Sequence, residues 1–514
     1  MQDNKPAMLR ASLTVTLFAA VALLSGCGGG GGGGSSAPAP APTPPPAATL
    51  PASNTLAQQC APTNPLAAAA NRTASLDQEK RWLRSYIDEA YLWYREVPTV
   101  DAASPAFSNT SNVPASMDAY FKALLTPALT SSGKRKDQFS FTFPTAEWNA
   151  LSQSGTAAGF GVEWVLGSST PPRNIRIAYV DPNTPAAANN LARGVTLVSV
   201  NGVSADDGTQ AGVATLNNAL FSPTLNTNYT FVLNNGTGTV TVQMTAQQVT
   251  KRPVLVSQVL DAPGGGKVGY IVFNDHITPA EGQLVTAFQQ MAQAGVNDLV
   301  LDLRYNGGGF LYIASQVGYM IAGATRTSNK VFERLQFNDK RVADNNDSNN
   351  RLPFFSATSG FANSGTTANT PLPTLNLARV FVLTGSSSCS ASESIINALQ
   401  GVDVQVIRIG RTTCGKPFGF TAKDNCGISY FPIEFQGVND KGFGEFADGF
   451  TPTCVVADDL SRALGNPAEG MLAAALSYRS TGSCPQAAVA TVQSATKPSL
   501  DLVLRPPVRE NKYR

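Results

Sequence analysis

From residue 268 to residue 409 the chain alternates between short apolar runs and longer amphipathic runs. The short runs have the length and composition of buried strands, and the longer ones repeat apolar residues at helical spacing. In chain order, strand-like and helix-like runs alternate through 268–273, 279–294, 298–303, 311–322, 379–383, 390–399 and 404–409. Successive β-α-β units imply a mostly parallel sheet with helices on its faces. We therefore expect an α/β domain over residues 254–486.

Two segments with different sequence patterns precede this domain. Residues 59–150 are expected to form a helical domain, because 75–94 carries one apolar stripe at helical spacing and a second helix is indicated near 117–125. Residues 157–250 alternate short β-rich runs with turns, and a short helix begins at Pro185. The expected fold class is multidomain α/β, with a helical N-terminal domain, a β-rich domain and an α/β core.

The first residues are typical of an export signal. Lys5 and Arg10 precede an apolar run that is too short to span a bilayer, which takes roughly 20 residues. The run ends in Leu24-Ser25-Gly26-Cys27, which resembles the bacterial lipobox, so we expect residues 1–26 to be a lipoprotein signal peptide and Cys27 to be lipidated. A cleaved signal peptide without lipid is the alternative. By resemblance to Gram-negative sorting signals, Gly28 favours the outer membrane, with the protein facing the periplasm.

Low-complexity sequence follows the signal. Residues 27–58 are rich in glycine and proline, and such a segment forms an extended, partly flexible tether. A tether suits a lipid anchor that holds a folded body off a membrane, although a linker without any role would have the same composition. Residues 487–514 are assigned to a C-terminal tail.

Charge and histidine content argue against several classes of function. Only 14% of the residues are charged, the net charge is +2, and Lys and Arg form no dense stripe. Nucleic acid is therefore not expected as a partner, because phosphate binding needs clustered positive charge. The single histidine, His276, cannot supply both histidines of an H-E-x-x-H zinc site. A Ser-His-Asp triad would have to recruit this one residue.

Beyond Cys27 the chain has an even number of cysteines, which in an exported protein suggests disulfides. They are Cys60, Cys389, Cys414, Cys426, Cys454 and Cys484. Many connectivities are possible. A local bridge between Cys414 and Cys426, and one between Cys454 and Cys484, are two candidates.

Three loops follow strands of the expected parallel sheet, at the edge where functional sites of open α/β sheets gather. The first, 302–309, ends in Gly307-Gly308-Gly309. Glycines let the backbone turn and expose N–H groups that can bind a developing oxyanion. Glycine loops of this kind also bind phosphate or simply turn.

The second loop, 384–393, places Ser390 at the start of a helix, where the dipole and free N–H groups stabilise negative charge. This position suits a nucleophilic serine. Ser390-x-x-Glu393 is also the spacing of a capping box, and capping alone would explain both residues.

The third loop, 410–416, ends in Lys416 and should lie beside the second. A lysine acts as a general base only when its pKa is lowered from about 10.4, which burial does. Lys416 beside Ser390 could then form a Ser-Lys variant of the catalytic triad. A surface lysine after a glycine is the alternative.

In this order the loops resemble those of the C-terminal processing peptidases, or tail-specific proteases. That family shows D-L-R-x-N-x-G-G, S-A-S-E and T-x-G-K motifs, which correspond here to 302–309, 390–393 and 413–416. Ser390 and Lys416 are 26 residues apart (416 − 390), close to the family's spacing. The resemblance extends over roughly residues 76–484.

The resemblance implies that Ser390 attacks the peptide carbonyl, that Lys416 is the base, and that the N–H groups of Ala391 and Gly308 form the oxyanion hole. It implies no metal and no cofactor. Several members carry a glutamine four residues after the lysine to orient it, but this chain has Phe420 there. Something else must then orient the lysine, or activity is low. Glu393 could contribute or could serve only as a cap.

The β-rich segment 157–250 resembles a bacterial PDZ domain. Gly159-Phe160-Gly161-Val162 matches the loop and strand start that grip the C-terminal carboxylate of a peptide, so Phe160, Gly161 and Val162 are the expected substrate-binding residues. The helix-then-strand signature follows at 183–202, with Val195 where the family usually has aspartate. A peptide would add as a strand to the sheet edge. A β-rich domain that binds nothing is the alternative.

The leading hypothesis is a serine endopeptidase that acts on the C-terminal tails of exported proteins. A catalytically weak or inactive protein that holds peptides in its PDZ domain without cutting them is the second. A hydrolase that uses His276 as its base is the third, and otherwise this histidine lines the groove or supports the structure.

Overall fold

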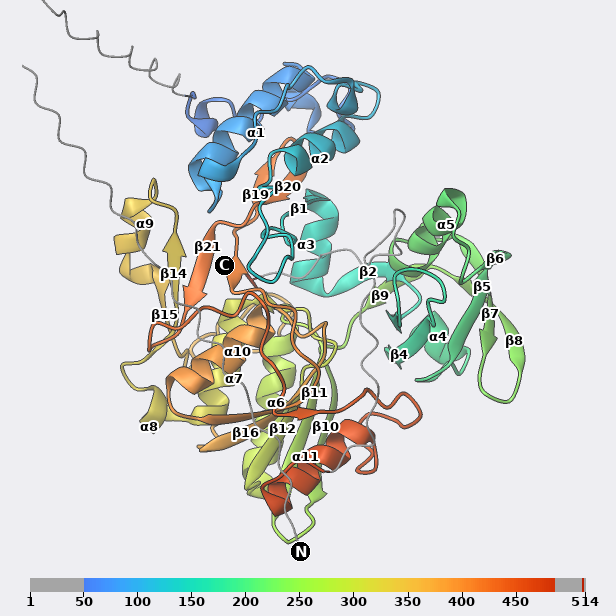
Figure 1. Ribbon diagram of the computed structural model, residues 1–514, viewed down its shortest axis with the longest axis vertical. Helices are drawn as coiled ribbons and strands as arrows, with labels where there is room; N and C mark the ends of the chain where they lie inside the picture. The colour runs from blue at the N-terminus through green and yellow to red at the C-terminus, as the bar shows by residue number, and fades with distance from the viewer. Residues whose placement is uncertain (1–49, 486–510, 513–514) are drawn as a thin grey trace, which may run out of the picture. The chain divides into compact units, whose positions relative to one another are not determined.

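A computed structural model describes residues 50–485 and the two-residue strand β23 (Asn511–Lys512) (Figure 1). Cys27, the expected signal peptide and most of the expected linker and tail lie outside the described residues. Within the part of the chain that is described, no helix combines the length and apolar character needed to cross a membrane.

A six-stranded sheet forms the centre of the α/β region, with strand order β10-β11-β12-β16-β17-β22. Its strands are β10 (Val254–Asp261), β11 (Lys267–Phe273), β12 (Asp298–Asp302), β16 (Arg379–Thr384), β17 (Gln405–Gly410) and β22 (Cys454–Val455). From β11 to β22 the neighbours pair in parallel, whereas β10 runs antiparallel at the edge. The other strands of the described residues pair antiparallel, with the exception of β13 and β23, which pair in parallel. Within the described residues, extensive parallel pairing is therefore confined to the six-stranded sheet.

Helices cover both faces of this sheet, as the β-α-β pattern predicts. One hydrophobic core joins one face to α6 (Ala280–Ala294), α7 (Leu311–Ala322) and α10 (Ala391–Gly401). A second core joins the other face to α11 (Gly470–Thr481). The mixed α/β class is confirmed, and the sheet presents the carboxyl ends of β12, β16 and β17 side by side.

The β-rich segment has a core of its own, built around an antiparallel sheet with order β3-β4-β5-β7-β8. Its elements are β3 (Val162–Val165), β4 (Arg176–Val180), α4 (Pro185–Ala188), β5 (Thr196–Val200), β6 (Val203–Ser204), α5 (Gln210–Phe221), β7 (Asn228–Asn234) and β8 (Thr239–Thr245). The pair β2 (Thr156–Gly159) and β9 (Gln247–Thr250) brings the two ends of the segment together.

The N-terminal helices share their core with a distant part of the chain. Helices α1 (Leu76–Ala90) and α2 (Val113–Ala123) pack with aromatic residues of the segment 418–433. Strand β1 (Phe141–Pro144) pairs with β20 (Ile428–Phe431), which also pairs with β19 (Lys423–Asn425). The domain expected over residues 59–150 is therefore not formed by contiguous sequence alone, because the β19–β20 hairpin completes its sheet and its core.

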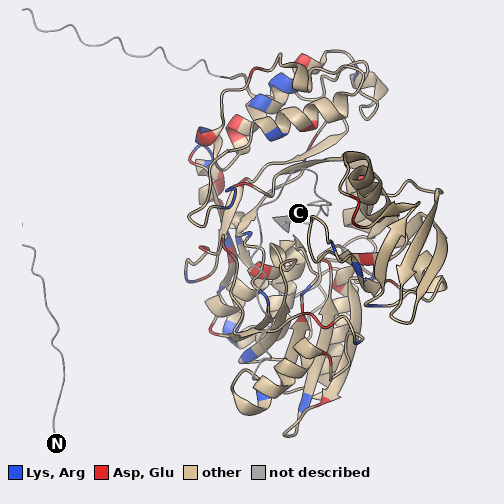
Figure 2. Cartoon of the chain, turned by 45° about the vertical axis from the view of Figure 1, so that its right-hand side comes forward, with Lys and Arg blue, Asp and Glu red and all other residues tan. Residues whose placement is uncertain are grey.

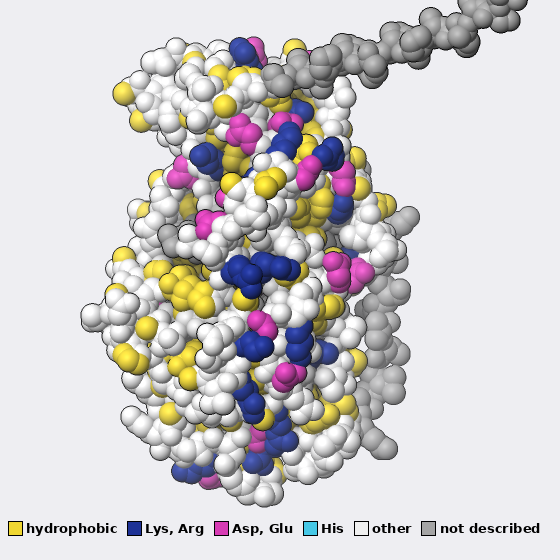
Figure 3. Space-filling view, turned by 90° about the vertical axis from the view of Figure 1, so that its left-hand side faces the viewer, with side chains coloured by type: hydrophobic (Ala, Val, Ile, Leu, Met, Phe, Trp, Pro, Cys, Tyr) yellow, Lys and Arg dark blue, Asp and Glu magenta, His cyan; other side chains and the backbone are white. Residues whose placement is uncertain are grey.

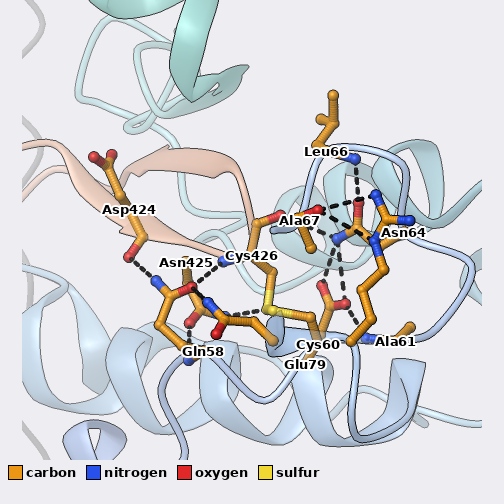
Figure 4. The surroundings of a disulfide bond; sticks show 12 residues. Gln58, Cys60, Ala61, Asn64, Leu66, Ala67, Glu79, Asp424, Asn425 and Cys426 are labelled. Atoms are coloured by element: carbon orange, nitrogen blue, oxygen red, sulfur yellow. Dashed lines mark hydrogen bonds between the residues drawn. A yellow bond between two sulfur atoms is a disulfide. The ribbon is translucent and has the colours of Figure 1, made fainter. Parts of the chain in front are cut away.

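A disulfide fastens this arrangement (Figure 4). Cys60 and Cys426 are both fully buried, and the side-chain amide of Asn64 donates to the carbonyl of Cys426 at 3.1 Å. The carboxylate of Glu79 accepts from the N–H of Ala61 at 2.7 Å. Burial raises the pKa of the Glu79 carboxyl. The start of the described chain is thereby tied to the hairpin that follows the third loop.

The disulfides correct one of the two expected pairings. Cys454 and Cys484 are bridged, so that pairing is confirmed. The pairing of Cys414 with Cys426 is wrong: Cys414 is bonded to Cys389, and Cys426 to Cys60. Proximity in sequence suggested a local bridge, but the fold brings each sulfur to a loop that is distant in the chain.

Charged side chains are spread over the molecule. Figure 2 shows Lys and Arg distributed along the ribbon with Asp and Glu among them, and the face in Figure 3 carries both signs close together. Ion pairs such as Lys340–Asp88 and Arg341–Glu434 account for part of this mixing.

Candidate active site

The three loops that the sequence singled out meet at one edge of the six-stranded sheet. The N–H of Cys389 in the second loop donates to the carbonyl of Asn306 in the first loop at 3.1 Å. The N–H of Cys414 in the third loop donates to the carbonyl of Ser388 at 3.0 Å. Because β12, β16 and β17 are adjacent and parallel, the loops that leave their carboxyl ends start side by side.

Ser390 is the residue before α10, and it is fully buried. Its backbone has φ 63° and ψ −121°, a region that serine rarely adopts and that persists only where the surroundings impose it. Its Oγ has no hydrogen-bond partner among the described residues. Ser390 and Glu393 stand in the positions of a capping box, yet the Ser390 hydroxyl makes no capping hydrogen bond. The strain therefore presents a side chain that local structure does not use.

Glu393 links the second loop to the third. Its Oε2 accepts from the N–H of Ser390 at 2.9 Å and from the N–H of Lys416 at 2.8 Å. Its Oε1 accepts from the N–H of Gly415 at 2.9 Å and from the hydroxyl of Thr413 at 2.5 Å. Burial raises the pKa of the Glu393 carboxyl, and these four hydrogen bonds oppose that rise. Glu393 is thus a bridge between the loops of the expected nucleophile and base, as well as a cap.

Lys416 is buried, with only 2% of its surface exposed. Its Nζ lies 4.3 Å from the centre of the Phe420 ring and 5.4 Å from that of Phe139. Phe420 belongs to the aromatic core and packs against Phe141. The position four residues after the lysine therefore supplies an aromatic face in contact range of the lysine head group. The sequence assigned no role at this site to Phe139, which lies far upstream.

Gly308 lies against the nucleophile loop. With φ 103° it has a conformation that favours glycine, and a Cβ here would lie 2.7 Å from the Cβ of Ser390 and 3.0 Å from the nitrogen of Ala391. Its own N–H, however, donates to Oδ1 of Asn306 at 2.9 Å. Ala391 is the first residue of α10, where N–H groups have no intrahelical acceptor. The two expected oxyanion donors therefore lie close together, but that of Gly308 is engaged within its own loop.

His276 supports the glycine loop. It is fully buried, and its Nδ1 lies 3.0 Å from Oδ1 of Asn306. Its N–H donates to the carbonyl of Gly308 at 3.1 Å, and its carbonyl accepts from the N–H of Phe310 at 2.8 Å. Of the roles weighed for this histidine, these contacts favour a structural one.

The outer edge of the glycine loop pairs with another part of the chain. Strand β13 (Gly309–Phe310) forms a parallel ladder with β23, in the register Gly309 to Asn511 and Phe310 to Lys512. An extended segment therefore lies along the residues that directly follow Gly308. The backbone of Gly309 and Phe310 therefore pairs with an extended strand.

Phe160, Gly161 and Val162 line a cavity of 210 Å³ together with the end of α5 and Lys251. The Phe160 ring is buried against Tyr229 and Phe231 in the core of the β-rich segment. Asp181 also lines this cavity, and burial raises the pKa of its carboxyl to about 6.

A contact missed by the sequence joins the β-rich segment to the first loop. Arg193 donates to the hydroxyl of Tyr305 and to the carboxylate of Asp458. The guanidinium of Arg304, the arginine of the D-L-R motif, pairs with Asp302 and with Glu469 at 2.8 and 2.7 Å. The D-L-R motif could have pointed to Arg304 from the sequence. No motif near Arg193 indicates its contact with the first loop.

Two family descriptions match this chain. Peptidase family S41 matches residues 267–424, which include all three loops, and the Peptidase S41 N-terminal domain matches residues 78–141. A carboxyl-terminal-processing protease from Picosynechococcus sp. is 26% identical over 268 residues, which is 52% of this chain and 56% of that protein. The chain thus matches about half the length of this curated relative.

A solved structure shares the fold. A Bacteroides fragilis protein described as an S41 protease superposes with a TM-score of 0.57 at 26% identity, covering 78% of this chain and 97% of that one. A photosystem II D1 C-terminal processing protease aligns with a TM-score of 0.43 at 18% identity, covering 75% and 94%.

Proposed function

We propose that this chain, which matches peptidase family S41 over residues 267–424 and its N-terminal domain over residues 78–141, is a serine endopeptidase that uses Ser390 as nucleophile and Lys416 as general base. One observation carries this proposal. Ser390 is buried in a strained conformation with an unused hydroxyl, and the carboxylate that binds its N–H also binds the N–H of Lys416. Such strain at a residue with no structural task is typical of a functional site.

In the proposed reaction Lys416 removes the proton of the Ser390 hydroxyl as the oxygen attacks the peptide carbonyl. The N–H of Ala391 stabilises the oxyanion that forms. Gly308 contributes a second donor if its N–H leaves Oδ1 of Asn306 when substrate binds. The lysine then returns the proton to the leaving amine, and water hydrolyses the acyl-serine. The reaction as proposed uses no metal and no cofactor.

The proposed substrates are polypeptides, cleaved near their C-terminal tails. The backbone edge at Gly309–Phe310, which pairs with β23, would align a substrate as an added strand. The β-rich segment would act as a PDZ module, with the backbone of Phe160, Gly161 and Val162 receiving the terminal carboxylate in the 210 Å³ cavity.

We further propose that the protein is anchored through a lipid on Cys27 to the outer membrane and faces the periplasm. Three disulfides within residues 50–485 support an oxidising compartment, because such bonds persist outside the cytosol. Incorporation of labelled palmitate into the wild-type chain and its absence in Cys27→Ala would test the anchor. Equal labelling of both would refute it.

Peptide binding without cleavage is the second candidate, and one observation favours it. The N–H of Gly308 is bonded to Asn306, so only one of the two expected oxyanion donors is available in this state. An enzyme with an incomplete oxyanion hole loses roughly 10²–10³-fold in rate.

Incubation of the full chain with an unfolded polypeptide, followed by mass spectrometry of the products, separates the two candidates. The endopeptidase proposal predicts internal cuts near the C-terminus with the wild type and none with Ser390→Ala. If the wild type and Ser390→Ala both bind the polypeptide and neither cleaves it, the endopeptidase proposal is refuted and peptide binding without cleavage takes its place.

A further inference from the structure

The disulfide between Cys389 and Cys414 lies at the centre of the candidate site. Cys389 directly precedes Ser390, and Cys414 stands two residues before Lys416. Their Cα atoms are 5.2 Å apart. Within the described residues, this is the one covalent link between the loop of the proposed nucleophile and the loop of the proposed base.

The noncovalent links between the two loops converge on the same place. Sγ of Cys414 lies 3.2 Å from Oε2 of Glu393, the oxygen that accepts from the N–H groups of Ser390 and Lys416. The disulfide and the Glu393 carboxylate therefore both link the loop of Ser390 to the loop of Lys416. Any movement of the sulfur changes the surroundings of the oxygen on which both loops depend.

The strain at Ser390 makes this link consequential. A serine with positive φ is strained and keeps that conformation only while its neighbours enforce it. Helix α10 fixes the residues after Ser390, and the disulfide fixes the residue before it. Without the covalent link, the chain before Ser390 is held only by hydrogen bonds, such as those from the N–H of Cys389 to Asn306 and from the N–H of Ser390 to Glu393.

We infer that the Cys389–Cys414 disulfide is a positioning device for Ser390 and Lys416, and that it makes peptidase activity depend on oxidation. The inference rests on the proposed function. Reduction by a dithiol transfers two electrons and two protons, converting the disulfide to two thiols while the dithiol becomes a disulfide. The new S–H of Cys414 can donate to Oε2 of Glu393 in competition with the two N–H groups, or as a thiolate repel that carboxylate.

Exposure differs among the three disulfides. Cys389 and Cys414 are both partly exposed, so a small reductant can reach them. Cys60 and Cys426 are fully buried. Cys484 is exposed, so Cys454–Cys484 is reachable as well. It joins β22, where Cys454 pairs with Ile409 just before the third loop, to the residues after α11, and it does not link the second loop to the third. Cys454→Ala/Cys484→Ala is therefore the matched control for the double variant of Cys389 and Cys414.

The test compares cleavage of an unfolded polypeptide by the full chain before and after treatment with dithiothreitol. EDTA is present throughout, because reduced Cys389 and Cys414 would lie with Glu393 as a possible metal-binding group. Alkylation and mass spectrometry identify the reduced disulfide. We expect kcat to fall at least tenfold with KM within twofold once Cys389–Cys414 is reduced, and to recover on reoxidation. Cys389→Ala/Cys414→Ala should have the same low kcat and no response to dithiothreitol, whereas Cys454→Ala/Cys484→Ala should behave like the wild type.

The outcomes separate the two proposals. An oxidised wild type that cleaves, with a reduced form of equal kcat, overturns this inference and leaves the proposed function intact. An oxidised wild type that does not cleave overturns the proposed function. If the double variant fails to fold, the reduction series on the folded wild type decides, since circular dichroism recorded on the same samples shows whether the fold survives.

Discussion

Ser390 and Lys416 donate their backbone N–H groups to the same oxygen of one buried carboxylate, Oε2 of Glu393, at 2.9 and 2.8 Å. The two residues lie on separate loops that follow neighbouring strands. This acceptor thus links the two loops, together with the Cys389–Cys414 disulfide and the hydrogen bond from the N–H of Cys414 to the carbonyl of Ser388. The side chain that orients the lysine loop is a glutamate from the nucleophile's own helix.

Replacing Glu393 by glutamine should lower kcat by about 10²-fold, the cost of a small misplacement of reacting groups. One amide oxygen cannot replace two carboxylate oxygens that together accept four hydrogen bonds. Steady-state cleavage of an unfolded polypeptide would measure the effect. Glu79→Gln is the matched control, because Glu79 is also buried and accepts a backbone N–H, but beside Cys60. An equal loss of kcat in both variants would contradict a specific role for Glu393.

Gly308→Ala should abolish detectable cleavage, because the new Cβ would meet the Cβ of Ser390 at 2.7 Å. Gly236→Ala provides the control: Gly236 has a similar φ of 92°, and nothing lies within 4 Å of the Cβ it would gain. The control should lose only about 1 kcal/mol of stability, the cost of a left-handed alanine. Rates and urea midpoints of both variants would be compared, and an active Gly308→Ala would refute the close approach.

Stability should depend on the ionisation of Glu333 on β14 (Val331–Phe337). Burial raises the pKa of its carboxyl from 4.5 to about 7. A raised pKa means that the folded state binds the proton more tightly, so stability is gained as pH falls from about 7 toward 4.5 and is lost as pH rises through 7. Glu333→Gln should therefore gain stability relative to the wild type at pH 8, by up to about 3 kcal/mol, but not at pH 4.5. Urea unfolding at both pH values would show it, and a difference independent of pH would count against it.

Removal of residues 486–514 should raise kcat/KM severalfold for an extended peptide. These residues include β23, which pairs with the edge at Gly309–Phe310 where the substrate strand is proposed to bind. The deletion leaves all six cysteines of the three disulfides in place. Kinetics of the full and shortened chains on one peptide series would decide, and an unchanged kcat/KM would mean that β23 does not compete with substrate.

The sequence predicted the α/β region well because its signals are local. Apolar runs of strand length, interrupted by helix-length stripes, located β11, β12, β16 and β17 and the helices between them to within a few residues. Parallel neighbours then bring the ends of their strands together, so the meeting of the three loops also followed from the pattern.

Contacts between segments far apart in the chain could not be predicted from the sequence. Nothing near Phe141 or Cys60 indicates that the hairpin around Cys426 completes their sheet and core, since the contact joins segments more than half the chain apart. The same limit explains the wrong pairing of Cys414. At Ser390 the spacing to Glu393 suggested an ordinary capping box, but the hydroxyl is not used for capping and the carboxylate reaches into the third loop.

The most direct test of the account compares kcat/KM on one unfolded polypeptide for the wild type, Ser390→Ala, Lys416→Met and His276→Asn. We predict losses of at least about 10³-fold for the serine and lysine variants, as expected for members of one catalytic unit. The histidine variant should keep measurable activity, because His276 only supports the glycine loop. Near wild-type activity in Lys416→Met, with activity abolished in His276→Asn as completely as in Ser390→Ala, would contradict the Ser390–Lys416 dyad.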